Sequence, residues 1–362
     1  AHGVLENPKP DGAVMLHVMS GIPMKHEPTI VIGQSITNAA DLNAFSLFQK
    51  GIDPLSGGKL TQRRVSGGPR FFDFQVAAPK SVSIMSLFDA RLIEAHREAV
   101  DEAMRELESL AAVRLRTGDH VFTNNYEITG QIIYAQFHHD ASRALDPQLH
   151  THNVVVNVTQ DSDGKYKALE SLEMCRAIRY AGKVYHNKLS ELCRQLGYEL
   201  ENHYDEKGRI LWKDIKGIPP EVMELYSKRR HEIEKLEEAF IAEHGRKPTL
   251  TENNQLSMSS RASKMKTATS AEVREYQLSQ LTAEQKRLLF RKADQVKWSQ
   301  PEKEWIDPEL VQKALREAVH LIFERESVVK LDKVLAEAMN QNLGAYPLEM
   351  LKEEAGELFK YI

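Results

Sequence analysis

The chain has 362 residues, of which 41% are hydrophobic and 28% charged, a composition typical of a folded globular protein and not of a disordered or fibrous one. No apolar run approaches the roughly 20 residues that a membrane helix needs, and the first residues lack the basic and apolar regions of a secretion signal, so we expect a cytoplasmic protein without membrane insertion. Two cysteines, Cys175 and Cys193, make a disulfide scaffold improbable, and a net charge of −4 means that any nucleic-acid surface depends on local clusters of Lys and Arg.

Short strands and turns are predicted before residue 78. Strands are expected at 13–19, 29–33 and 71–77, with glycine-rich connections between them. Pro79 then favours the start of a helix. From Leu92 to Leu110 apolar residues recur at helical spacing, which predicts a long amphipathic helix.

Two further strands are predicted at 130–139 and 149–159, and a turn follows at 161–165. From Ser171 onward the pattern becomes mainly helical. The order of a sheet first and helices later indicates the α+β class.

A polar stretch at 245–266 carries several Lys and Arg residues and little apolar periodicity. It is interpreted either as a solvated loop or as a mobile basic arm that closes over a nucleic acid. Helical periodicity resumes after Pro301, and we place a boundary near residue 305, giving a domain at 1–305 and a helical segment at 306–362. The GxxxxGK[ST] pattern of an ATP-driven motor does not occur in the chain.

Three histidines form the most informative pattern, within HHDASRALDPQLHTHNVVVNV (138–158). His150 and His152 stand two apart on a predicted strand and therefore share one face of the sheet. A turn at Asp146 and Pro147 would pair this strand with the one that ends at His139. Three imidazoles on rigid strands suit a catalytic divalent metal, and the ordinary alternative is three unrelated histidines.

Asp73 is a carboxylate in the middle of an apolar strand, where an unpaired charge would be costly. It is either half of a structural ion pair or an acceptor that orients a metal-binding histidine or takes a proton from a nucleophile. His138, next to His139 with its side chain on the opposite face, is expected to be an ordinary histidine.

The segments DFQVAAPKSVS (73–83), the histidine segment and KALESLEMCRAIRYAGKVYHNKLSELCRQLGYEL (167–200) together resemble the MobF-type, TrwC/TraI-like conjugative relaxases of the HUH endonuclease family. The resemblance implies an antiparallel sheet flanked by helices, and cleavage of one DNA strand at a transfer origin by a tyrosine that keeps the 5′ phosphate. It implies that His139, His150 and His152 hold a divalent ion (Mg, Mn or Zn) and that Asp73 is the acidic residue beside them. Single-stranded DNA and other conjugation proteins would be the partners.

Arg143, in HDASR (139–143), and Lys80, in APKS (78–81), are the candidate phosphate contacts, because the cationic side chain of each could bind a phosphate. Residues 314–339 also resemble the start of the helicase region that follows the nicking domain in longer members, although a plain helical bundle would explain the same periodicity.

The nucleophile cannot be assigned from the sequence. Family members carry their tyrosines near the N-terminus, whereas the first tyrosine here is Tyr126. Either an upstream segment supplies the tyrosine or the site has diverged. Two alternatives therefore stay open, a non-catalytic relaxase homologue that binds single-stranded DNA and a three-histidine hydrolase that uses a metal-bound water.

Overall fold

The computed structural model describes most of the chain from Pro69 onward and parts of the region before it. The described residues are 14–19, 29–32, 35–37, 47, 50–53, 56–60, 69–115, 126–205, 208–259, 269–298, 306–324, 326 and 328–359. The glycine-rich stretch at 66–68 and part of the polar stretch at 245–266 lie outside them. In the part of the chain that the structure describes, no helix is long and apolar enough to cross a membrane.

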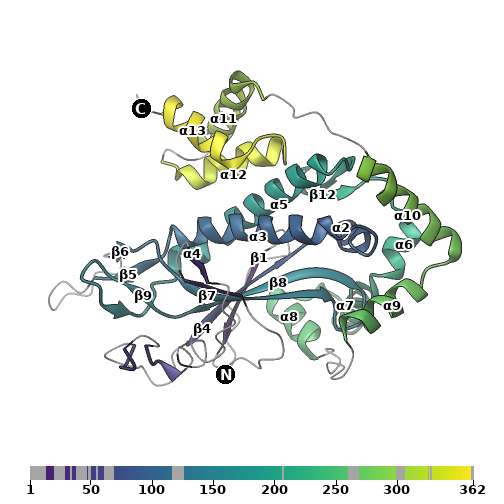
Figure 1. Ribbon diagram of the computed structural model, residues 1–362, viewed down its shortest axis with the longest axis horizontal. Helices are drawn as coiled ribbons and strands as arrows, with labels where there is room; N and C mark the ends of the chain where they lie inside the picture. Colours follow the sequence, from purple (N-terminus) through teal and green to yellow (C-terminus); the bar gives the residue numbers. More distant parts are fainter. Residues whose placement is uncertain are drawn as a thin grey trace.

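An antiparallel six-stranded sheet forms the centre of the molecule, in the order β1-β4-β8-β7-β2-β3 (Figure 1). Its strands are β1 (Val14–Met19), β2 (Thr29–Ile32), β3 (Ser35–Thr37), β4 (Phe71–Ala77), β7 (Ile133–Ala141) and β8 (Pro147–Val156). The predicted strands therefore exist, and the α+β class with an antiparallel sheet is confirmed.

Alternation along β4, β7 and β8 gives the sheet two different faces. Phe74, Tyr134 and Val155 point to a large core shared with helices. Phe137 and Val154 point the other way and belong to a smaller apolar cluster. Each strand is therefore buried on both sides, but only one side is covered by the long helices.

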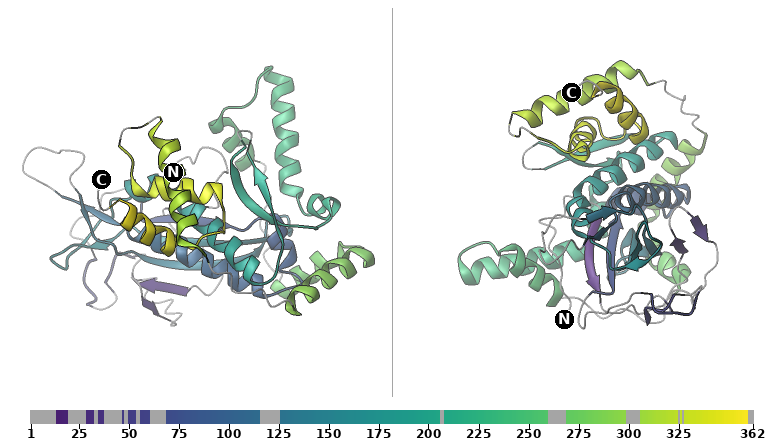
Figure 2. Two further views of the ribbon diagram at one scale, coloured as in Figure 1. Left: turned by 90° about the horizontal axis from the view of Figure 1, so that it is seen from above. Right: turned by 90° about the vertical axis from the view of Figure 1, so that its left-hand side faces the viewer.

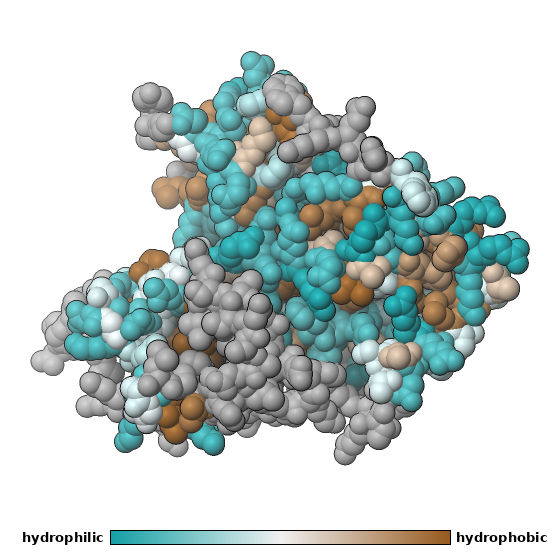
Figure 3. Space-filling view, in the orientation of Figure 1, coloured by the Kyte–Doolittle hydropathy of each residue, from teal (hydrophilic) through white to brown (hydrophobic). Residues whose placement is uncertain are grey.

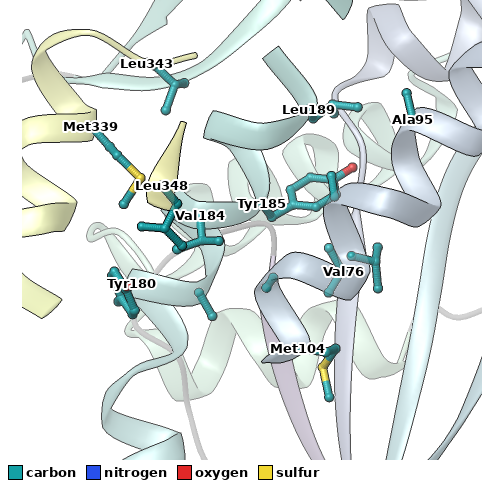
Figure 4. Close-up of a cluster of buried hydrophobic side chains, with 14 of the residues drawn as sticks. Val76, Ala95, Met104, Tyr180, Val184, Tyr185, Leu189, Met339, Leu343 and Leu348 are labelled. Carbon is teal, nitrogen blue, oxygen red and sulfur yellow. The ribbon is translucent and has the colours of Figure 1, made fainter. Parts of the chain in front are cut away.

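Helices α2 (Lys80–Met85), α3 (Arg91–Glu108) and α5 (Ile178–Gln195) cover the first face. The helix predicted after Pro79 and the amphipathic helix predicted from Leu92 are thus α2 and α3, and the buried side chains of α3 repeat at helical spacing. Figure 4 shows this core, where Val76 of the sheet and Tyr185 of α5 lie together with Met339 from the C-terminal region.

Further strands and helices surround these layers. They are β5 (Ala112–Arg114), β6 (Tyr126–Ile128), β9 (Thr159–Gln160), β10 (Tyr166–Lys167), α4 (Leu172–Arg176), β11 (Leu200–Tyr204), β12 (Ile210–Ile215), α6 (Pro220–Leu225), α9 (Ser270–Ser279) and α10 (Ala283–Trp298). The first two pairs of strands form separate two-stranded sheets, as do β11 and β12.

Two helices project from the body of the molecule, α7 (Lys228–His244) and α8 (Leu250–Ser259), as Figure 2 shows. The α8 helix lies within the polar stretch 245–266, which was interpreted as either a solvated loop or a mobile basic arm, so the loop interpretation is wrong for residues 250–259. The cause of this helix is local, because Thr249 and Glu252 bond each other's backbone N–H groups in a capping box. This pair supplies the start signal that apolar periodicity does not provide.

Three C-terminal helices, α11 (Pro308–Phe323), α12 (Leu331–Gln341) and α13 (Leu348–Leu358), pack on one another, and α12 and α13 also pack on α5. The turn after α12 is hydrogen-bonded directly to α5. The Gly344 N–H donates to the Asn187 side-chain oxygen over 2.7 Å, and the Arg194 guanidinium donates to the Gly344 carbonyl. Gly344 has φ +75°, and a Cβ atom there would lie 2.5 Å from the Cβ of Ser190. Only glycine fits this junction without a shift.

Candidate functional site

The three predicted histidines meet on the face of the sheet that lies opposite the long helices. His139 and His150 are directly paired across β7 and β8, and His152 is one step further along the same face. The centroid of the His139 ring lies 5.0 Å from that of His150 and 5.5 Å from that of His152, and the last two are 5.4 Å apart. The sequence-based grouping of these side chains is therefore what the fold produces.

Hydrogen bonds fix which ring nitrogen carries the proton in two of these histidines. Nδ1 of His150 lies 2.9 Å from the Gln148 carbonyl, and Nδ1 of His152 lies 2.7 Å from Oδ2 of Asp73. A carbonyl and a carboxylate only accept hydrogen bonds, so both Nδ1 atoms donate. In the neutral form of each ring Nε2 is then the unprotonated nitrogen, the form that binds metals.

Asp73 is the buried carboxylate that the sequence places beside the histidines. Only 4% of the residue is exposed, and it lies on the same face of β4 as the histidine cluster, diagonal to His152. Its second oxygen, Oδ1, is buried and has no hydrogen-bond partner among the described residues. A buried carboxylate held by one imidazole alone leaves part of its charge uncompensated and favours added positive charge nearby.

The donor set therefore suits a divalent metal, although the rings are not yet convergent. In the described part of the chain no three His, Cys, Asp or Glu side chains have the spacing of a metal site as they stand. The reason is visible in the rings, because His139 and His150 stack with an interplanar angle of 22°. Convergence of the three Nε2 atoms on one ion would therefore require the rings to reorient, and the geometry of such sites often tightens only when a ligand binds.

The residue between the two β8 histidines points into the core instead. Thr151 Oγ1 lies 3.0 Å from Nε2 of His96 and 3.0 Å from Nδ1 of His138. Nδ1 of His96 lies 2.7 Å from the Tyr185 hydroxyl. Burial is the main cause that lowers the pKa of His96 to about 3, and burial lowers that of His138 to about 4, so both rings are neutral at pH 7. A chain of hydrogen bonds thus fastens β8 to α3 and α5 directly behind the histidine cluster.

The hydrogen bonds behind the histidine cluster were not predicted from the sequence. His138 was expected to be an ordinary histidine, and it lies on the opposite face from His139 as predicted, but its bond to Thr151 was not foreseen. His96 and Tyr185 come from helices far away along the chain, so no local spacing marks them. The signal that could have pointed to Thr151 is its position, since a polar residue between two site histidines must face the core.

The two candidate phosphate contacts lie at the end of the sheet near the histidines. Lys80 begins α2, and its ammonium donates to the Pro147 carbonyl over 3.1 Å, at the start of β8. Burial lowers its pKa, although Asp146 opposes this effect. Arg143 is exposed on the turn between β7 and β8.

That turn is held firmly by its neighbours. Leu145 adopts a left-handed φ of 63°, and its carbonyl accepts a bond from Gln277 of α9 over 3.0 Å. The buried Asp146 carboxylate pairs with Lys228 over 3.1 Å. Arg143 therefore stands on a rigid support next to the histidine cluster.

A tyrosine nucleophile would have to reach the face of the sheet that carries the three histidines. Tyr134 belongs to the core on the helix-covered face, as the alternation along β7 predicts. Tyr185 lies on that face too, and its phenol is fully buried. Neither side chain reaches the face that carries His139, His150 and His152.

Comparison with known proteins places the chain in a defined group. A family model described as TrwC relaxase matches residues 31–283. Over 173 residues, 45% of this chain, it is 40% identical to the multifunctional conjugation protein TraI of Escherichia coli, of which this stretch covers 9%. The chain thus spans a small part of the curated relatives that it matches.

Solved structures give the same picture. A copper-bound structure of the conjugative relaxase TrwC in complex with oriT DNA aligns with a TM-score of 0.61 and 28% identity, covering 73% of this chain and 87% of that one. A complex of TrwC with a 27-mer DNA comprising the recognition hairpin and the cleavage site aligns with a TM-score of 0.60 and 28% identity, over 70% and 90% of the two chains.

Proposed function

The chain belongs to the TrwC relaxase family, and we propose that it cuts one DNA strand at a transfer origin by transesterification, as a step in conjugative DNA transfer. A single strand of DNA is the substrate, and other proteins of the transfer machinery are the partners. Work on the DNA of a donor cell would place the protein in the cytoplasm.

One observation carries the proposal, namely that His150 and His152 are both held with Nδ1 protonated and lie beside His139. Histidines whose tautomers are set by a carbonyl and a carboxylate are prepared to bind a metal ion through Nε2. Such an arrangement is unusual for three histidines that share a surface by chance.

Each residue has a distinct role in this proposal. His139, His150 and His152 would hold a divalent ion, with magnesium, manganese and zinc as the candidates. Asp73 orients His152 and raises the basicity of its Nε2 atom. When bound, the ion supplies positive charge that neutralises the oxygens of the scissile phosphate. Arg143 and Lys80 are the proposed contacts to neighbouring phosphates, and Arg143 is the better exposed of the two.

A labelling experiment tests the proposal. The chain is incubated with 5′- and 3′-labelled single-stranded oligonucleotides that carry the transfer-origin sequence, with manganese or EDTA, and the products are separated on a denaturing gel. We expect a metal-dependent covalent adduct that His150→Ala abolishes. Peptide mass spectrometry of the adduct then identifies the nucleophile.

His138→Gln is the matched control, because His138 lies in the same segment but on the helix-covered face. This variant should retain adduct formation. Metal-dependent cutting without an adduct would overturn the proposal in favour of a three-histidine hydrolase. Tight DNA binding without cutting would overturn it in favour of a non-catalytic homologue.

A further inference from the structure

The exposed face of α10 combines aromatic and cationic side chains in an unusual way. Trp298 is 81% exposed and Phe290 59%, although both belong to a well-formed helix. Arg287 and Arg291 lie on the same side, because positions i, i+3, i+4 and i+11 of a helix share a face. Asp294 lies on this side too.

The face is positively charged. The α10 sequence holds five cationic and two acidic residues, and no ion pair occupies Arg287, Arg291 or Lys297 within the described residues. The exposed apolar residues of α11 lack this setting, because the cations and acids of that helix are balanced in number. The cationic excess therefore singles out α10.

A basic pocket adjoins the end of this face. It has a volume of about 450 Å³ and is lined by Arg91, Arg274 and Lys297, together with Asp89 and the adjoining Phe88 and Ala90. The Asp89 carboxylate is already neutralised, since Arg91 pairs with it over 2.7 Å and the Tyr198 hydroxyl donates to it over 2.9 Å. The remaining charge in the pocket comes from Arg274 and Lys297 and is positive.

We propose that the exposed face of α10 and this pocket form a second contact surface for the single-stranded DNA, with bases stacked on Phe290 and Trp298 and phosphates held by Arg287, Arg291 and the pocket. A single strand offers both the flat base faces and the regular negative charges that this pattern needs. A protein partner would match the aromatic side chains, but it would need acidic residues at the spacing of these cations, whereas the phosphates of a single strand supply that charge at every nucleotide.

The position of α10 fits a strand that leaves the histidine cluster. The preceding helix α9 contacts the turn that carries Arg143, through the bond from Gln277 to the Leu145 carbonyl, and also contacts the end of α2, where Arg274 donates to the Leu87 carbonyl over 2.6 Å. Figure 1 shows α10 at the outer edge of the molecule, and in Figure 3 brown patches interrupt the teal surface along that edge. DNA that extends past the turn would meet α9 and then α10.

Fluorescence anisotropy with a long fluorescein-labelled oligodeoxythymidylate tests this inference on the full chain. Replacing Phe290 and Trp298 together by alanine should weaken binding by roughly 5- to 100-fold for each lost stack. A chain with the single replacement Trp298→Phe should keep most of the affinity of the unaltered chain, because phenylalanine still offers a flat ring for stacking. Replacing Arg287 and Arg291 by glutamine should reduce the slope of log affinity against log salt by about 0.7 for each cation.

The α11 helix supplies the matched control, because Phe323 is 51% exposed, much like Phe290. Phe323→Ala should leave DNA affinity unchanged. Unchanged affinity in the α10 variants would overturn the inference, and so would an equal loss in Phe323→Ala. If the α10 variants lost as much affinity for a duplex of equal length, base stacking would be excluded.

The inference takes its ligand from the proposed function, but the two fail separately. Absence of a covalent adduct with the unaltered chain counts against the proposed function and leaves the anisotropy result intact. Conversely, the α10 variants should still form the adduct on a short oligonucleotide that ends near the cleavage site. Loss of that adduct would show that α10 supports the histidine site and not a separate contact.

Discussion

The Asp73 carboxylate accepts a 2.7 Å hydrogen bond from Nδ1 of His152 across two neighbouring strands. This bond couples a fully enclosed charge to a ring that is part of the proposed metal centre. It makes Asp73 a positioning residue, because its effect on the ion would pass through His152.

Asp73→Asn should therefore weaken binding of manganese or zinc by about 10- to 100-fold, since an amide no longer holds the Nδ1–H tautomer with the same strength. Isothermal titration calorimetry measures the affinity. The control is Asp101→Asn, because Asp101 bonds Gln136 on the helix-covered face. Equal metal affinity in Asp73→Asn and the unaltered chain would contradict the role given to Asp73.

Thr151→Val should lower the free energy of unfolding by about 1–3 kcal/mol, because it leaves buried polar atoms of His96 and His138 without their shared partner. Urea denaturation measures this change. Thr151→Ser keeps the hydroxyl and should recover most of the loss. If the Thr151→Val variant were as stable as the unaltered chain, the hydrogen bonds behind the histidines would make no net contribution to the free energy of unfolding.

Stability should fall in acid through His96 and His186. Burial lowers the pKa of each from 6.5 to about 3. Between these values the unfolded chain binds protons that the native chain does not, so the free energy of unfolding decreases as pH falls through this window. The expected slope is about 1.4 kcal/mol per pH unit for each histidine.

His186→Gln should reduce the slope of the free energy of unfolding against pH by the contribution of one histidine. Urea denaturation at several pH values measures this slope. His320→Gln, on the exposed surface of α11, is the control and should not alter the slope. A slope that is the same in all three proteins would show that His186 is protonated in the native state.

Gly344→Ala should loosen the C-terminal helices from α5, at a cost of about 1–3 kcal/mol, because the new methyl group meets Ser190 at a positive φ. Limited proteolysis between α10 and α11, together with thermal unfolding, would detect the change. Gly356→Ala in α13 is the control, because a Cβ atom there meets open space. It should be neutral or stabilise the helix by about 0.5–1 kcal/mol.

The parts of the fold that follow local rules were predictable from the sequence. The alternation along β8 placed His150 and His152 on one face, and a short turn paired them with His139. The contacts of Thr151 with His96, and of Gly344 with Asn187, were not predictable, because they join elements far apart along the chain whose packing no spacing records.

The α8 helix shows a different limit. Its residues have little apolar periodicity, so a search for amphipathic patterns overlooks them, although the capping pair of Thr249 and Glu252 stands in the sequence. The domain boundary near residue 305 stays a prediction, because residues 299–305 lie outside the described part of the chain.

The sequence His-Thr-His at 150–152 ties the chemistry of the site to the correctness of the fold. The two outer residues face the proposed metal centre and the middle one is bonded into the core. If β8 slipped by one residue against its neighbours, a hydroxyl would enter the site and two imidazoles would be forced under the helices. A sheet with the wrong register would lose the ion and the core contacts together. Binding of the ion would therefore favour the correctly folded chain over chains in which β8 is shifted.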